Sequence, residues 1–262
     1  MGAVTTERVV VVGDAHLGSA DPADEAAFHE FLAAVPSLGT RLIIMGDLFE
    51  FWFEYRRVIP RRAFKTLAKI AAVKEAGVQV EMFGGNHDRW SGWPGNFWSD
   101  LGIPFYPEGR DLELAGRKAW VHHGDGLAEW KLGGKILHKV TRSPITIALW
   151  RAIHPDVGFW LIDRLGFLIS EKVKTPAALD AAAELQERYA RSMLDRRPEL
   201  QLVLMAHTHR QRLIEVAPGR FYLNAGQWMR DRQYAVVTSA SVWVGRWSDQ
   251  PTDRQLDDSL LV

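Results

Sequence analysis

The chain has 262 residues, of which 47% are hydrophobic, enough for one large domain or for a core with a cap. Its 32 basic and 32 acidic residues balance, which argues against a general nucleic-acid binder because such proteins carry a basic surplus. The absence of cysteine excludes both disulfides and thiolate metal sites.

The first half of the chain alternates apolar runs with helical segments. Helices are predicted for residues 22–35 and from residue 60 or 61 to residue 76, where a proline near the start and Gly77 after the end are typical of helix boundaries. Strands are predicted for residues 9–13, 42–45, 78–83, 110–115 and 117–122. The order is therefore β-α-β-α-β followed by a pair of strands.

The pattern changes to helices after residue 125. Residues 126–197 read as a helical cap insertion whose last part, residues 176–197, is a charged amphipathic helix that returns to the core. Strands resume with residues 202–205, 211–216, 221–224, 234–238 and 241–244. We expect an α/β (α+β) protein with two β-rich halves and outer helices, in which residues 1–125 and 198–248 form the core and the polar residues 249–262 form a loose tail.

Side chains that bind metals follow five of the predicted strands. They are carboxylates, imidazoles and a carboxamide: Asp14, His16, Asp47, Asn86, His87, His123, His207 and His209. Strand ends present their next residues at one edge of a sheet, so these segments can converge on one site. An extended backbone would put Asp14 and His16 on one side, and likewise His207 and His209. Asp47 alone could be a turn residue and His87 a loop histidine, but five such segments together indicate a metal site.

The number of candidate ligands points to two ions. Without His87 there are seven candidates, which exceed what one tetrahedral site needs, and they fill two sites if one carboxylate bridges. Mixed nitrogen and oxygen ligands without cysteine suit Mn²⁺, our first expectation, with Fe²⁺ or Zn²⁺ as alternatives. Phosphatases and nucleases use two metal ions about 3.5–4 Å apart for in-line displacement at phosphorus. The sequence therefore predicts hydrolysis of a phosphate ester or anhydride.

The order D-x-H, GD, GNHD, HGD, HxH resembles the calcineurin-like metallophosphoesterases over nearly the whole chain. Ala206 stands where that family has glycine before its last two histidines. Residues 46–52 (GDLFEFW) and 123–126 (HGDG) are similar to the UDP-2,3-diacylglucosamine diphosphatases of lipid A synthesis, although some members of that group have arginine where this chain has His87. The resemblance implies a four-layer α-β-β-α sandwich with a helical cap.

The resemblance also implies a role for each motif residue. His87 would bind no metal and would stabilise charge on the phosphoryl group or protonate the leaving oxygen. Asp88 and Asp125 would bind no metal and would orient the ligand loops and imidazoles. One ion would be held by Asp14, His16, Asp47 and His209, and the other by Asp47, Asn86, His123 and His207, with Asp47 as the bridge.

The predicted cap combines apolar side chains with a basic surplus. Residues 126–174 hold eight lysines and arginines against four acids. This composition fits an anionic amphiphile or a membrane surface, and equally a lid whose apolar face packs on the core. Trp90, Trp93 and Trp98 either line the same cleft or belong to the core. Substrate contacts are expected from Asn86, His87, His207, Arg151, Lys172, Trp150 and Phe159.

Together these features predict a two-metal hydrolase that converts UDP-2,3-diacylglucosamine to UMP and 2,3-diacylglucosamine 1-phosphate. The alternatives are a phosphoesterase acting on a soluble nucleotide phosphodiester or diphosphate and, from another class, a non-catalytic protein-binding scaffold. We expect a lipid-linked nucleotide as substrate and no nucleic acid as partner. The start of the chain has no signal-peptide pattern, and no apolar run reaches the ~20 residues of a membrane span. These features predict a cytoplasmic protein that is peripheral on the inner face of the cell membrane.

Overall fold

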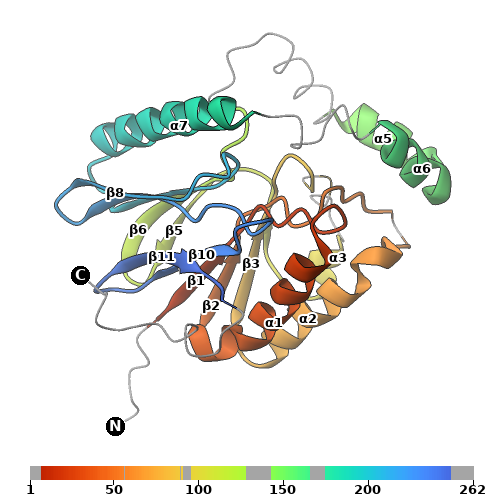
Figure 1. Cartoon of the computed structure of the whole chain (residues 1–262), viewed down its shortest axis with the longest axis horizontal. Coiled ribbons are helices and arrows are strands. Elements are labelled where there is room, and N and C mark those ends of the chain that lie inside the picture. The colour runs from red at the N-terminus through yellow and green to blue at the C-terminus, as the bar shows by residue number, and fades with distance from the viewer. Residues whose placement is uncertain are drawn as a thin grey trace.

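The computed structural model describes residues 7–55, 57–88, 90, 96–127, 143–165 and 175–248. Its strands form two sheets (Figure 1). The six-stranded sheet has the order β11-β10-β1-β2-β3-β4 and the five-stranded sheet the order β5-β6-β7-β9-β8. The strands are β1 Val9–Val12, β2 Arg41–Ile44, β3 Gln79–Phe83, β4 Phe105–Tyr106, β5 Arg110–Leu114, β6 Arg117–Val121, β7 Leu202–Met205, β8 Arg212–Ala217, β9 Arg220–Asn224, β10 Gln233–Val237 and β11 Val242–Arg246.

Helices cover the outer face of each sheet (Figure 1). The helical elements are α1 Pro22–Leu38, the 3₁₀ turn η1 Arg61–Ala63, α2 Phe64–Glu75, α3 Phe97–Asp100, α5 Pro144–Ala152, α6 Pro155–Leu165 and α7 Pro176–Arg196. Helices α1 and α2 pack on the six-stranded sheet, and α7 packs on β7 and β9 of the other sheet. The predicted four-layer α-β-β-α sandwich is confirmed.

Strand β1 explains why the central strands read as continuous apolar runs. Val10 and Val12 point toward α1 and α2, whereas Val9 and Val11 point between the two sheets, where they meet residues of β6 and β7. Successive side chains of a strand alternate between its faces, so a strand buried on both sides must be apolar throughout. Parallel pairing of β1 with β2 and of β2 with β3 then brings the carboxyl ends of these strands to one edge.

Helix α1 extends beyond its predicted end. We expected it to stop at residue 35, before Pro36, but it continues to Leu38, and Gly39 N–H then donates to Val35 O at 2.9 Å. A proline in the last turn removes one backbone hydrogen bond, and the burial of Val35 and Leu38 against the sheet compensates for the loss. The predicted α7 is confirmed almost to the residue.

Helices α5 and α6 lie within the predicted cap insertion, between β6 and α7 in the chain, and in Figure 1 they lie at one end of the molecule. They carry the exposed apolar side chains Ile145, Leu149, Val157 and Trp160. No described helix has the length and apolar character needed to cross a membrane. The predicted tail 249–262 lies outside the described residues.

Candidate metal centre

The loops that follow β1, β2, β3, β6 and β7 bring together His87 and all the predicted ligands except Asn86, which is exposed. Nitrogen and oxygen atoms within 4.8 Å of one another define three overlapping groups of buried or half-buried side chains. These groups are Asp14 with His16 and His209, Asp47 with His16 and His87, and Asp47 with His123 and His207. Asp47 and His16 each belong to two groups, so the ligands form one continuous cluster.

Five of these residues adopt a left-handed backbone, which our expectation of extended segments did not include. The φ angles are 50° at Asp14, 45° at His16, 49° at Asp47, 73° at His207 and 56° at His209. Non-glycine residues rarely adopt such angles, and each costs on the order of 1–3 kcal/mol. The inference of one extended face was therefore wrong, because the chain turns sharply at each ligand and sends His207 and His209 into different groups.

Each of three histidines donates its Nδ1–H to a fixed acceptor. His16 donates to Glu50 Oε2 at 2.9 Å, His123 to Met45 O at 2.7 Å and His87 to Glu50 O at 2.6 Å. A carbonyl oxygen only accepts, so the tautomer of His87 and His123 follows from its partner. In all three rings Nε2 therefore faces the cluster and is the atom that would bind a metal once the ring is neutral, which is the arrangement that metal-binding histidines adopt.

Several buried atoms of the cluster have no hydrogen-bond partner among the described residues. They are Asp14 Oδ1, Asp47 Oδ2, His87 Nε2 and His123 Nε2. Buried polar atoms are almost always hydrogen-bonded. Here Asp47 Oδ2 and His123 Nε2 face each other at 3.3 Å only as an ion pair, so a cluster of such atoms suits a bound cation. Carboxylate oxygens and imidazole nitrogens suit divalent transition metals. These residues therefore fit a metal pair.

Asp47 lies at the middle of the cluster. Its Oδ1 accepts a hydrogen bond from His87 N at 2.8 Å, which leaves Oδ2 at 3.3 Å from His123 Nε2 and 3.9 Å from His16 Nε2. Gly85 packs so closely that a Cβ there would lie 2.1 Å from Asp47 Oδ1. The glycine of the GNHD motif is thus needed for the two loops to approach each other.

The metal-free cluster holds protons at neutral pH. Burial raises the pKa of the Asp14 carboxyl to about 7, although His123 opposes the change. Burial alone would lower the pKa of His123, but the Asp47 carboxylate beside it raises that pKa to about 10. Burial also opposes ionisation of Asp47, yet His123 and its neighbours hold the pKa of Asp47 well below its usual range. His123 and Asp47 therefore form an ion pair, and Asp14 carries a proton for part of the time.

The two aspartates predicted to orient the site are both buried. Asp88 accepts backbone hydrogen bonds from Leu48 N and Gly85 N, both at 2.7 Å, and so ties the loops after β2 and β3 together. Asp125 is 2% exposed, and its charge contributes to the raised pKa of His123. The alanine at 206 has no positive φ, so the glycine of the family pattern is not required there.

Glu50 is a site residue that our sequence reasoning missed. It holds His16 through its carboxylate and His87 through its carbonyl oxygen, so one residue fixes two imidazoles. Its His16 contact outweighs burial and lowers the pKa of Glu50, which keeps the carboxylate charged. Residues 46–52 were recognised as a motif of the resembled family. The sequence of this motif does not show which of its residues contacts the histidines.

The predicted substrate contacts are divided between the metal cluster, the backbone of Glu54 and the aromatic rings around Phe51. Asn86 is exposed, and His207 is half-buried in the cluster. Arg151 donates from Nε to Glu54 O at 3.1 Å, and Lys172 lies outside the described residues. Trp150 and Phe159 both contact Phe51, with ring centroids 6.2 and 6.1 Å apart.

The aromatic contacts of Phe51 make the joint between the cap and the core. Trp90 also packs there, 5.8 Å from Phe51 and 5.9 Å from Trp150. Trp98 is fully buried beside Trp52 and belongs to the core, and Trp93 lies outside the described residues. Of the three tryptophans considered as walls of a cleft, only Trp90 is shown at the cap.

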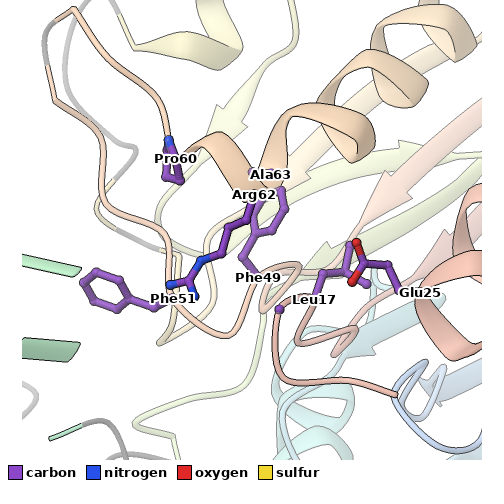
Figure 2. A pocket seen from close by; sticks show the side chains of 8 residues that line it. Leu17, Glu25, Phe49, Phe51, Pro60, Arg62 and Ala63 are labelled. Atoms are coloured by element: carbon purple, nitrogen blue, oxygen red, sulfur yellow. The ribbon is translucent and has the colours of Figure 1, made fainter. Parts of the chain in front are cut away.

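Two hollows lie beside this joint. The larger, of about 700 Å³, has one wall from Tyr55 and residues 58–62 and another from residues 154–156 and Phe159. The smaller, of about 50 Å³, is lined by Phe51 and Arg62, and in Figure 2 the Arg62 side chain reaches toward Phe51, whose ring points away from it. The Arg62 guanidinium also lies 5.3 Å from the ring centre of Phe159, so this side chain links η1 to α6.

Comparison with known proteins gives the same family as the motifs. A model of the calcineurin-like phosphoesterases matches residues 7–211. A UDP-2,3-diacylglucosamine hydrolase of Porphyromonas gingivalis is 30% identical over 250 residues, which cover 87% of this chain and 93% of that protein. The protein of the same name from Escherichia coli K12 is 28% identical over 234 residues, covering 88% and 95%.

Solved structures with a similar arrangement have low sequence identity. Vacuolar protein sorting 29 from Cryptosporidium parvum has a TM-score of 0.45 and 14% identity, covering 93% of this chain and 92% of the other. The phosphoesterase Yfce of E. coli has a TM-score of 0.41 and 16% identity, covering 93% and 94%.

Proposed function

The chain belongs to the calcineurin-like phosphoesterase family, and from this premise we propose that it hydrolyses the diphosphate of UDP-2,3-diacylglucosamine to UMP and 2,3-diacylglucosamine 1-phosphate. That it is a metal-dependent phosphoesterase follows from the family and from the cluster of aspartates and histidines. The choice of substrate is supported by the relatives that carry the name of that hydrolase. The buried cluster around Asp47 is the observation that carries the chemistry.

Two divalent ions, with Mn²⁺ as our first expectation, would be held by the cluster. Asp14, His16, Asp47 and His209 would hold one ion, and Asp47, Asn86, His123 and His207 the other. Such a pair supplies an activated water and neutralises charge on the phosphoryl group. Asp47 Oδ2, between His123 and His16, suits a bridging ligand.

His87 is proposed to act on the substrate. Its Nδ1–H is held by Glu50 O, and its backbone N–H by Asp47, so the ring has a fixed orientation with Nε2 toward the cluster. In the protonated state, Nε2–H would donate to a phosphoryl oxygen or pass its proton to the leaving oxygen. A ring fixed in advance loses little entropy when the substrate binds.

The cap is proposed to bind the two acyl chains. Ile145, Leu149, Val157 and Trp160 are exposed on the neighbouring helices α5 and α6, and apolar side chains gathered in this way suit a ligand or a surface that covers them. The hollow of about 700 Å³ lies at the same end of the molecule and carries Arg61 and Arg62 at its wall. Cations beside apolar surface suit a lipid with a diphosphate head group. A soluble nucleotide would need no such surface.

We further propose that the protein is cytoplasmic and peripheral on the inner face of the cell membrane, with the same side chains resting on the membrane surface. Arg164 lies 5.7 Å from the ring centre of Trp160, so a cation accompanies the exposed indole. Basic side chains near an anionic surface contribute about 1 kcal/mol each. Binding to anionic vesicles but not to neutral ones would support this part of the proposal.

Hydrolysis assays with Mn²⁺ test the substrate. The diacylated UDP-sugar is compared with a UDP-sugar without acyl chains and with a small phosphodiester. We expect much faster turnover of the diacylated substrate, and ¹⁸O from labelled water in UMP. Preference for either soluble substrate would refute the lipid assignment, and no turnover of any of them would favour a scaffold.

Variants separate the role of the cap from that of the core. Leu149→Ser and Trp160→Ser should raise KM for the diacylated substrate and leave the small phosphodiester unaffected, because each buried methylene contributes ~0.8 kcal/mol. Phe64→Ser is the matched control, since Phe64 is 64% exposed on α2, outside the cap. If the Phe64 variant changes KM as much, the cap is not the acyl site.

A further inference from the structure

A buried amide from α7 lies behind the loop that carries His207 and His209. Gln186 is 1% exposed, and its Oε1 accepts hydrogen bonds from Tyr222 Oη at 2.8 Å, Asn224 Nδ2 at 2.9 Å and Thr208 Oγ1 at 3.3 Å. Its Nε2 donates to Ala206 O at 2.9 Å. One side chain thus binds strand β9 and the loop after β7.

Ala206 connects this network to the second ligand loop. Its N–H donates to His123 O at 2.7 Å, while its carbonyl accepts from Gln186 and, at 3.1 Å, from Asn224. Gly124, the neighbour of His123, approaches so closely that a Cβ would lie 2.2 Å from Gln186 Nε2. The amide therefore touches both loops that supply the imidazoles of one proposed ion site.

Packing alone does not account for a glutamine at this position. The other buried side chains of α7 on this face are apolar: Ala183, Ala190 and Leu194. Burying an amide costs free energy unless all its groups are paired, and here they are. Burial raises the pKa of Tyr222, so its hydroxyl keeps its proton and can donate. Both polar atoms of the Gln186 amide therefore have partners.

We propose that Gln186 is a positioning residue of the metal centre, which fixes the separation between the loop of His123 and the loop of His207 and His209. The inference rests on the two-metal site of the proposed function. The hydrogen bonds of Gln186 go to Ala206, Thr208, Tyr222 and Asn224, so this side chain acts through the backbone of Ala206. It also joins the return helix of the cap insertion to the centre, a link that the spacing of the ligand motifs does not reveal.

Metal affinity measured without substrate tests this role. Gln186→Met keeps the length and volume of the side chain and removes every hydrogen bond. We expect Mn²⁺ affinity to fall about 10- to 100-fold, the usual effect of removing a group that orients metal ligands. The electron paramagnetic resonance spectrum of the Mn²⁺-loaded variant should also change, because the spacing of the two ions changes.

Leu194→Ala is the matched control, because Leu194 is fully buried on the same helix and packs in the cluster of Val203 and Tyr222. It should lower the Tm and leave both the affinity and the spectrum unchanged. If the Met variant does not fold, Gln186→Asn holds the amide one methylene short of its partners and should give the same loss.

Unchanged affinity and spectrum in a folded Gln186 variant would overturn the inference, as would an equal loss of affinity in Leu194→Ala. Normal binding of two Mn²⁺ by the unmutated protein without hydrolysis of the lipid substrate would overturn the proposed function. That outcome would leave the role of Gln186 intact, so the two failures are distinguishable.

Discussion

Metal binding to the ion-free protein should depend on pH, and differently at the two sites. An ion can bind Asp14 and His123 only after each has lost its proton. With a pKa of about 7, Asp14 becomes tenfold more available between pH 6 and pH 8. With a pKa of about 10, His123 becomes a hundredfold more available over the same range. At about 1.36 kcal/mol per decade, the affinity gain is about 1.4 kcal/mol at the Asp14 site and about 2.7 kcal/mol at the His123 site.

Competition between the protein and a chelator for Mn²⁺, repeated from pH 6 to pH 8, measures both affinities. Calorimetry in buffers with different ionisation enthalpies counts the protons released at each pH. Above pH 7 we expect the affinity of one site to level off while that of the other keeps rising tenfold per pH unit. Two affinities that are both constant between pH 7 and pH 8, with no proton release, would refute the assignment of a charged His123 paired with Asp47.

Three further substitutions test the bridging role of Asp47, the catalytic role of His87 and the effect of the buried Glu54 on stability. Asp47→Ala should lose both ions and nearly all turnover, and elemental analysis showing two tightly bound ions would refute the bridge. His87→Ala should lower kcat by roughly two to four orders of magnitude at unchanged metal content, and loss of an ion would make it a ligand. Burial raises the pKa of Glu54 to about 7, so its contribution to folding is present below pH 4.5 and is lost as the pH rises toward 7. Glu54→Gln should therefore flatten the fall in Tm of the ion-free protein between pH 5 and pH 8.

The strands and long helices could be predicted because their causes are local. Strand β7 is buried on both faces, so its four residues are all apolar, and a window of the sequence suffices to recognise it. The two-residue strand β4 was not predicted, because Phe105 and Tyr106 pair with β3 only once the sheet exists. Strands this short have no pattern of their own.

The ligands could be predicted by type and position but not by geometry. Asp14 and His16 lie in one group, as expected, yet they reach it through left-handed backbone angles that a spacing of two residues does not encode. Such angles persist only where surrounding contacts hold them, and here the contacts are long-range, such as Asp14 N–H to Gly46 O and His16 N–H to Asp47 O. Glu50 was missed for the same reason, because its two histidine partners come from other loops.

The contacts between the cap and the core determine which substitutions can test whether the cap binds the acyl chains. Trp150 and Phe159 were predicted to contact the substrate, and both pack against Phe51. Phe51 follows Glu50, which holds His16 and His87, so a polar substitution at either cap residue would disturb the loop that orients two imidazoles. Turnover of every substrate would then fall, whether or not the side chain touches lipid. Leu149 and Trp160 are exposed on the same helices, so substitutions there can separate acyl binding from the geometry of the metal centre.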